Sequence, residues 1–192
     1  MRKAVVVRKT KEVEISVDLN IDGTGESQIE TNIKFLNHLL TTLTKHSLFD
    51  LSLQAKGDLK HHVTEDVALA LGESVKKALE EGKGIRRFGT AYVSMDESLA
   101  RAVIDLGGRP YAIIDLNINQ PKIEDLIMED IEHFFTSFAQ SSKINLHLTV
   151  LYGSNEHHKI EAAIKAMALA LREAAALEPR IIDRIPSAKG VL

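Results

Sequence analysis

The sequence predicts an α+β protein made of two pseudo-symmetric half-domains, each a β-sheet with two helices packed on one face. Two observations lead to this prediction. Segments with strand and helix periodicity follow one another in the same order in both halves of the chain, and a His-His-x-x-Glu motif occurs once in each half, at 61–65 and at 157–161. We expect the first half-domain to span residues 1–85 and the second to span 86–192, fused into one compact unit.

The first half is expected to have the order ββαβα. Residues 12–18 alternate between polar and apolar side chains, as in a half-buried strand, and turn-forming residues at 22–25 then predict a hairpin. Apolar residues at helical spacing from Ile33 to Leu43 predict an amphipathic helix that contains His38. A strand over 49–55 follows, and residues 61–84 predict a second helix that Gly82 and Gly84 end.

The second half is expected to repeat this order. Segments around 88–95, 99–106 and 111–118 are rich in strand-forming residues, and a helix, a strand near 144–151 and a final helix follow. When the helices are aligned, His38 pairs with His133 and HHVTE at 61–65 pairs with HHKIE at 157–161, at offsets that differ by about one residue. An internal duplication explains this agreement.

Composition narrows the class of protein. With 192 residues, 44% of them hydrophobic, the chain can bury a sizeable core, and a net charge of -3 without a long basic run argues against a nucleic-acid partner. No stretch approaches the roughly 20 apolar residues of a membrane span, and there is no signal-peptide pattern, so we expect a cytoplasmic protein without membrane association. Because cysteine is absent, a transition metal would be held by histidine and carboxylate, which favours harder divalent ions.

The repeated motif predicts two metal centres. On a helix, residues three and four apart share a face, so both histidines of a motif can approach its glutamate, whereas adjacent histidines point about 100° apart. Each motif is therefore expected to serve both centres. The candidate ligands are His38, His61, His62, Glu65, His133, His157, His158 and Glu161. About four ligands per ion would leave roughly two open octahedral positions, which indicates a catalytic site.

Seven segments spread over the chain resemble those of a known protein family. They are RKTKEVEISVDLNIDGTG, FLNHLLTTLTKH, KGDLKHHVTEDVALALG, GIRRFGTAYVSMDESLARAVIDLGGRP, EHFFTSFA, LHLTVLYGSNEHHKIEAAIKA and PSAKGVL. In this order they resemble the imidazoleglycerol-phosphate dehydratase family. The resemblance implies an enzyme of histidine biosynthesis that converts D-erythro-imidazole glycerol phosphate into imidazole acetol phosphate. It also implies two Mn²⁺ per subunit on the eight ligands above, sites completed by neighbouring subunits, and a homo-oligomeric shell of twenty-four subunits.

The same resemblance assigns roles to further residues. Guanidinium and ammonium groups suit a phosphate monoester, and the residues implied for the substrate phosphate are Arg87, Arg109, Lys165, Ser187 and Lys189. Glu12 is implied as an acid/base that contacts the substrate. The catalytic candidates are Glu12, Glu65, Glu161 and His46. His46 also fits a simpler interpretation, because a histidine near the C-terminal end of a helix interacts favourably with the helix dipole. His147, in an alternating strand, is interpreted as structural.

Four positions depart from the family pattern. Asn37 stands where an acid is usual, Leu39 replaces a methionine, Thr42 replaces a glutamine that helps hold phosphate, and Ala188 replaces a hydroxyl residue. The change at Thr42 puts one phosphate contact in doubt. It leaves the proposed metal ligands unchanged, and the change at Ala188 is expected to be tolerated.

Two alternative functions fit the motifs alone. A binuclear metallohydrolase would use two metals near a phosphate ester to activate water, although imidazole-rich sites with few bridging carboxylates are less typical of phosphatases. A metal-storage or metal-triggered assembly protein would use the motifs to cross-link subunits, but would leave the basic residues without a purpose. Phosphate release and binding of an imidazole phosphate distinguish the three functions.

Overall fold

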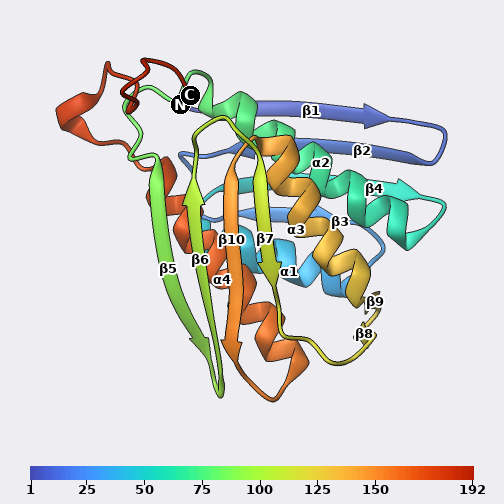
Figure 1. Cartoon of the computed structure of the whole chain (residues 1–192). Helices are drawn as coiled ribbons and strands as arrows, with labels where there is room; N and C mark the ends of the chain where they lie inside the picture. Colours follow the sequence, from blue (N-terminus) through green and yellow to red (C-terminus); the bar gives the residue numbers. More distant parts are fainter.

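The second half of the chain repeats the strand order of the first in the computed structural model, which describes residues 1–192 (Figure 1). The first half contains β1 (Lys3–Lys9), β2 (Val13–Asn20), β3 (Ser27–Glu30), α1 (Lys34–Ser47), β4 (Asp50–Gly57) and α2 (Lys60–Leu79). The second half contains β5 (Phe88–Met95), β6 (Ser98–Asp105), β7 (Tyr111–Asp115), α3 (Met128–Ser142), β10 (Asn145–Tyr152) and α4 (Glu156–Ala175). A short hairpin of β8 (Lys122–Ile123) and β9 (Leu126–Ile127) leads into α3, and a 3-10 helix at Pro179–Ile181 follows α4.

The two four-stranded sheets have the same topology. Their strand orders are β1-β2-β4-β3 and β5-β6-β10-β7. In each sheet the last two strands in this order are parallel, and the other neighbours are antiparallel. Agreement in both order and direction indicates an internal duplication, so the predicted α+β class with two pseudo-symmetric halves is confirmed.

The predicted ββαβα order of the first half is wrong by one strand. β1 precedes the predicted strand, and the hairpin joins β1 to β2 through residues 10–12. The turn at 22–25 leads instead into β3, which pairs with β4. Asp50, at the start of β4, explains this path, because one carboxylate oxygen accepts hydrogen bonds from the backbone N–H groups of Thr24, Gly25 and Glu26. The turn is thereby held against β4 instead of folding back along β2.

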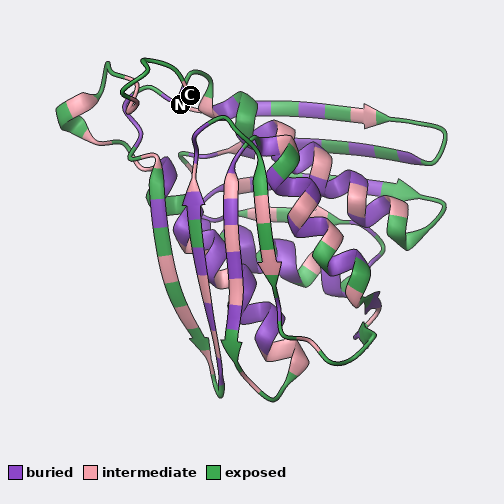
Figure 2. Ribbon diagram, in the orientation of Figure 1, coloured by how far each residue is buried: buried purple, intermediate pink, exposed green.

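All four helices cover the inner faces of the sheets (Figure 1). α2 packs on β1 and β2, α4 packs on β5 and β6, and across the halves α1 contacts α4 while α2 contacts α3. Every second residue along β2 is buried, which gives the sheet one face for helices and one for solvent (Figure 2). The 52 buried apolar residues form one continuous core drawn from both halves. None of the helices is both long and apolar enough to cross a bilayer.

The two halves approach each other closely at Gly72 of α2. A Cβ atom at this position would lie 2.7 Å from the carbonyl oxygen of Phe138 and 2.9 Å from Cβ of Ser141, both in α3. The glycine therefore lets the backbones of α2 and α3 pack without an intervening side chain.

Gly72→Val should lower the free energy of unfolding by about 1–3 kcal/mol, because the added atoms force the two helices apart. Lys76→Val puts the same β-branched residue at an exposed position of α2 and should cost only about 0.5 kcal/mol in helix propensity. Urea unfolding of the two variants measures the difference. Equal effects would show that the α2–α3 contact tolerates a side chain at residue 72.

Candidate metal centres and phosphate pocket

Both His-His-x-x-Glu motifs lie in the first turns of their helices. His61, His62 and Glu65 stand at the start of α2, and His157, His158 and Glu161 stand at the start of α4. At α4, the Asn155 side chain accepts hydrogen bonds from the backbone N–H groups of His157 and His158, which fixes where the helix begins. The two histidines of each motif diverge, with interplanar angles of 89° for His157 and His158 and 61° for His61 and His62.

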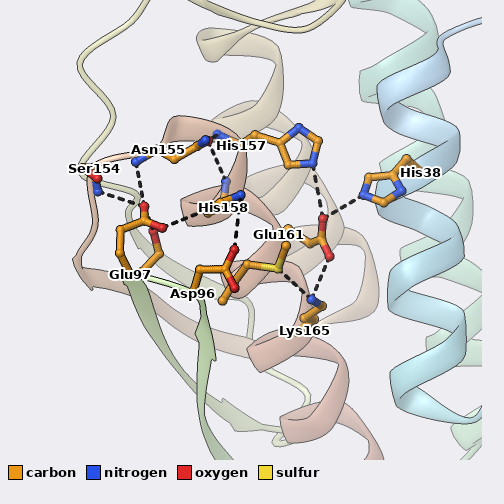
Figure 3. Close-up of polar contacts among 11 residues, drawn as sticks. His38, Asp96, Glu97, Ser154, Asn155, His157, His158, Glu161 and Lys165 are labelled. Carbon is orange, nitrogen blue, oxygen red and sulfur yellow. Dashed lines mark hydrogen bonds and ion pairs between the residues drawn. The ribbon is translucent and has the colours of Figure 1, made fainter.

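The first group of candidate ligands consists of His38, His157 and Glu161, which we call the His38 cluster (Figure 3). Nε2 of His38 lies 2.9 Å, and Nε2 of His157 3.3 Å, from the same carboxylate oxygen of Glu161. Nζ of Lys165 lies 2.7 Å from the other oxygen. Burial opposes ionisation of Glu161, but hydrogen bonds from Lys165 and His38 outweigh it and lower the pKa to about 2. The carboxylate is therefore ionised, as a metal ligand must be.

The second group consists of His61, Glu65 and His133, which we call the His61 cluster. Nε2 of His133 lies 3.1 Å from Glu65 Oε1, and Nε2 of His61 lies 3.9 Å from Glu65 Oε2. The His133 contact lacks hydrogen-bond geometry, so this buried ring nitrogen has no hydrogen-bond partner. Behind His61, Oδ1 of the buried Asp130 lies 2.6 Å from Nδ1. The residue types repeat those of the His38 cluster, but the two imidazoles approach different oxygens of Glu65, whereas those of the His38 cluster converge on one oxygen of Glu161.

Each cluster draws its residues from both halves of the chain. His38 on α1 meets the motif on α4, whereas His133 on α3 meets the motif on α2. This crosswise pairing follows from the packing of α1 on α4 and of α2 on α3. Neither half alone contains a complete cluster.

The second histidine of each motif faces away from the clusters. Nδ1 of His62 lies 2.7 Å from Asp58, and Nδ1 of His158 lies 2.8 Å from Glu97 (Figure 3). These hydrogen bonds raise the pKa of both histidines. Because a carboxylate occupies each Nδ1, Nε2 is the nitrogen that each ring presents to other groups.

Glu97 is a site residue that the sequence prediction missed. Its carboxylate accepts hydrogen bonds from the backbone N–H groups of Ser154 and Asn155 and from the hydroxyl of Ser98, in addition to its contact with His158 (Figure 3). Hydrogen bonds from His158 and then from Asn155 hold the pKa of Glu97 well below its usual range. The internal duplication could have indicated Glu97 as a site residue, because Glu97 immediately precedes β6 as Glu12 immediately precedes β2.

Two of the catalytic candidates lie outside the clusters. Glu12, whose side chain is 56% exposed, has its carboxylate 3.9 Å from Nδ1 of His62, so it accompanies the outward-facing histidine. His46 lies in the last turn of α1. Burial lowers the pKa of His46, and the nearby charge of Lys165 lowers it further.

Four of the five phosphate candidates line one cleft of about 400 Å³. They are Arg87, Arg109, Ser187 and Lys189. The guanidinium of Arg87 donates two hydrogen bonds to Asp105 and one to the carbonyl oxygen of Pro186. These bonds tie the C-terminal segment to the second sheet. They leave two of the five N–H donors of the Arg87 guanidinium for a ligand. The fifth candidate, Lys165, lies at the His38 cluster instead.

Two of the departures have visible structural consequences. The side-chain oxygen of Asn37 accepts hydrogen bonds from the backbone N–H and hydroxyl of Thr31, which fixes the segment before α1. Thr42 is 8% exposed and belongs to the buried face of α1. We find no role for Thr42 in the phosphate pocket.

The donor sets suit a divalent cation. In the His38 cluster, one ligand atom from each of the three residues lies within 4.8 Å of the other two. In the His61 cluster, the unpartnered Nε2 of His133 points to a missing partner. Imidazole and carboxylate together bind first-row divalent metals.

Comparison with known proteins identifies the family. The family model for imidazoleglycerol-phosphate dehydratase matches residues 31–171. The imidazoleglycerol-phosphate dehydratase of Chlorobium luteolum is 50% identical over 194 residues, which cover 100% of this chain and 96% of the relative. That of Caldanaerobacter subterraneus subsp. tengcongensis is 49% identical over 195 residues, which cover 100% of both chains.

Solved structures agree. The imidazoleglycerol-phosphate dehydratase of Staphylococcus aureus has a TM-score of 0.82 and 35% identity, and covers 91% of this chain and 100% of its own. The enzyme from Pyrococcus furiosus, in complex with (S)-C348, has a TM-score of 0.84 and 32% identity, and covers 97% of this chain and 100% of its own.

These similarities define the chain as a hydro-lyase, an enzyme that removes water from a small-molecule substrate. It belongs to the imidazoleglycerol-phosphate dehydratase family, whose reaction is part of histidine biosynthesis. The resemblance found in the sequence is confirmed. The relatives named here are dehydratases, so neither alternative function gains support from them.

Proposed function

We propose that this chain dehydrates D-erythro-imidazole glycerol phosphate with two Mn²⁺ per subunit, at sites shared between neighbouring chains of a homo-oligomer. The observation that carries the proposal is the pair of histidine–glutamate clusters, each with an outward-facing histidine beside it in sequence. The three residues of each cluster would hold one ion. The Nε2 atoms of His62 and His158 would reach the ions of adjacent chains.

The metal would bring one kind of chemistry to the site. When bound, Mn²⁺ would supply a Lewis acid that withdraws electron density from the imidazole ring of the substrate. Glu65 and Glu161 support this assignment, because carboxylate oxygens together with imidazole nitrogens are donors that first-row divalent cations bind.

The protein residues would position the substrate and move a proton. Glu12, exposed beside His62, is our candidate to take the proton from C2 as a general base. The C2 proton and the C3 hydroxyl leave together as one water molecule. The enol that remains becomes the ketone of imidazole acetol phosphate when a proton returns to carbon.

The phosphate pocket supports sharing of the site between chains. The backbone N–H of Arg87 donates to the carbonyl oxygen of Ala174, which follows Glu161 by thirteen residues of α4, or about 20 Å. In the substrate, three carbons and one oxygen separate ring from phosphate, about 6 Å with bonds near 1.5 Å. This backbone separation is much longer than the ring-to-phosphate span of the substrate, which favours a substrate that bridges the cluster of one chain and the phosphate pocket of another.

The His61 cluster is similarly remote from this pocket. Leu192, which lines the pocket, lies against Gly82, just beyond the end of α2. The cluster stands at the opposite end of that helix. Sites shared between neighbouring chains of a closed assembly would suit the twenty-four-subunit shell implied by the resemblance. The mass of the particle in solution tests that number.

The decisive experiment is incubation with imidazole glycerol phosphate with and without Mn²⁺, with detection of the enolisable ketone. We expect ketone only with metal and no release of inorganic phosphate. Phosphate release without ketone would instead favour the metallohydrolase.

Arg109→Ala and Lys189→Ala should each raise KM by about tenfold or more, since a hydrogen bond to a charged group contributes about 1.5–3 kcal/mol. Both residues line the phosphate pocket, remote from the clusters, so metal content should stay the same. Steady-state kinetics and metal analysis check the two expectations separately. If either variant loses metal, or if KM is unchanged in both, the phosphate assignment is wrong.

A further inference from the structure

We propose that the two clusters of one chain bind divalent cations unequally, and that the His61 cluster binds more tightly and fills first. This inference rests on the proposed metal dependence. Its basis is that the two clusters are built from the same residue types but have different residues at two equivalent positions beside them.

The first difference lies behind the first histidine of each motif. Asp130 stands three residues before His133 on α3, is 4% exposed, and has Oδ1 2.6 Å from Nδ1 of His61. A buried carboxylate at this distance holds the ring in one orientation and fixes the proton on Nδ1. Nε2 is then presented to the metal as a stronger donor.

The His38 cluster lacks this support. The position three residues before His38 on α1 is Phe35, whose ring centroid lies 5.0 Å from that of His157. Nδ1 of His157 is left with Glu124, at 3.2 Å, on the short loop between β8 and β9, and that side chain is 58% exposed. An exposed carboxylate on a loop restrains the ring less than a buried one on a helix.

The second difference is electrostatic. Lys165 stands four residues after Glu161 and places its ammonium 2.7 Å from the carboxylate. The equivalent residue after Glu65 is Leu69. A cation bound to Glu161 must therefore compete with a lysine, whereas a cation bound to Glu65 does not. Coulomb repulsion from Lys165 weakens the His38 site further.

The remaining donors do not offset these differences. The outward-facing histidines, which would complete the sites from neighbouring chains, are matched, with Nδ1 2.7 Å from Asp58 in one case and 2.8 Å from Glu97 in the other. His158 also has the carboxylate of Asp96 3.8 Å from its Nε2, but that side chain is 75% exposed and can turn away when the nitrogen binds an ion. The two histidines therefore bring similar support. At limiting metal, the chains should therefore carry their first ion in the His61 cluster.

Two measurements on the full-length protein test this order. After chelation, one equivalent of Mn²⁺ per chain is added to the protein, which is then crystallised. Anomalous diffraction at a wavelength where manganese scatters measures the occupancy of each cluster. We expect several-fold higher occupancy at the His61 cluster than at the His38 cluster. Equal occupancy, or a preference for the His38 cluster, would overturn the proposal. If neither cluster takes up Mn²⁺ even in excess, the proposed metal dependence is at fault instead.

Asp130→Asn then isolates the first difference. In a calorimetric Mn²⁺ titration this change should weaken the tighter class of sites by about 10–100-fold, the usual effect of removing a carboxylate behind a ligating histidine. Glu129→Gln is the matched control, because Glu129 is an exposed carboxylate in the same turn of α3. Equal effects of the two variants would show that general charge, and not the contact with His61, sets the affinity.

Discussion

Removal of metal should abolish dehydration and break the assembled particle into smaller species. Both effects have one cause, since the outward-facing His62 and His158 would bind ions held by neighbouring chains. An ion that binds only the assembled state stabilises it by mass action. Mild acid should act in the same direction, because histidine must be neutral to bind metal.

Metal analysis, activity and light scattering measure this prediction together. We expect two Mn²⁺ per chain before chelation, and recovery of both particle size and activity when Mn²⁺ is restored at neutral pH. One ion per chain, or full activity after exhaustive chelation, would reject the two-site proposal. An unchanged particle mass without metal would mean that each site is complete within one chain.

Glu12→Gln should lower kcat by about 10²–10⁴, the range that a general acid or base contributes. Metal content and particle size should be unaffected, because Glu12 lies outside both clusters and its carboxylate is 3.9 Å from Nδ1 of His62. This combination separates loss of a proton acceptor from loss of a metal ligand.

Glu14→Gln provides the control for this change. Glu14 is an exposed carboxylate on β2, two residues away, and its ion pairs are with Lys9 and Lys56. We expect kcat to remain close to that of the unmodified enzyme. If Glu12→Gln retains kcat within a few-fold, another residue removes the proton, and Glu97 at the equivalent position becomes the next candidate.

Much of the fold could be predicted from the sequence because helix and strand periodicities are local signals. The helix that carries His38 lies where apolar spacing predicts it. The helix of the first motif was predicted from its charges and from Gly82 and Gly84, but it ends earlier, at Leu79. β1 was missed because Val5 and Val7 face solvent, with exposures of 64% and 71%, so the strand has no alternation of polar and apolar residues. β3 has only four residues, too few to show a period.

The candidate site was predictable in its residue types but not in its pairing. Spacing shows that His61 and His62 diverge, because that property belongs to a single helix. It cannot show that His38 meets Glu161, which lies 123 positions later, or that Asp130 supports His61 across 69 positions. Such contacts depend on how α1 packs on α4 and α2 on α3. The position of Lys165 at the His38 cluster, apart from the other phosphate candidates, has the same origin.

The crosswise pairing of helices has an evolutionary consequence. A homodimer of one undivided βββαβα unit would build the same two clusters, with the single histidine of each copy meeting the motif of the other. Such an ancestor would have possessed identical sites, and any substitution would have altered both at once. Fusion of two gene copies would remove that constraint, and the two halves now carry different residues at the equivalent positions, Phe35 against Asp130 and Leu69 against Lys165.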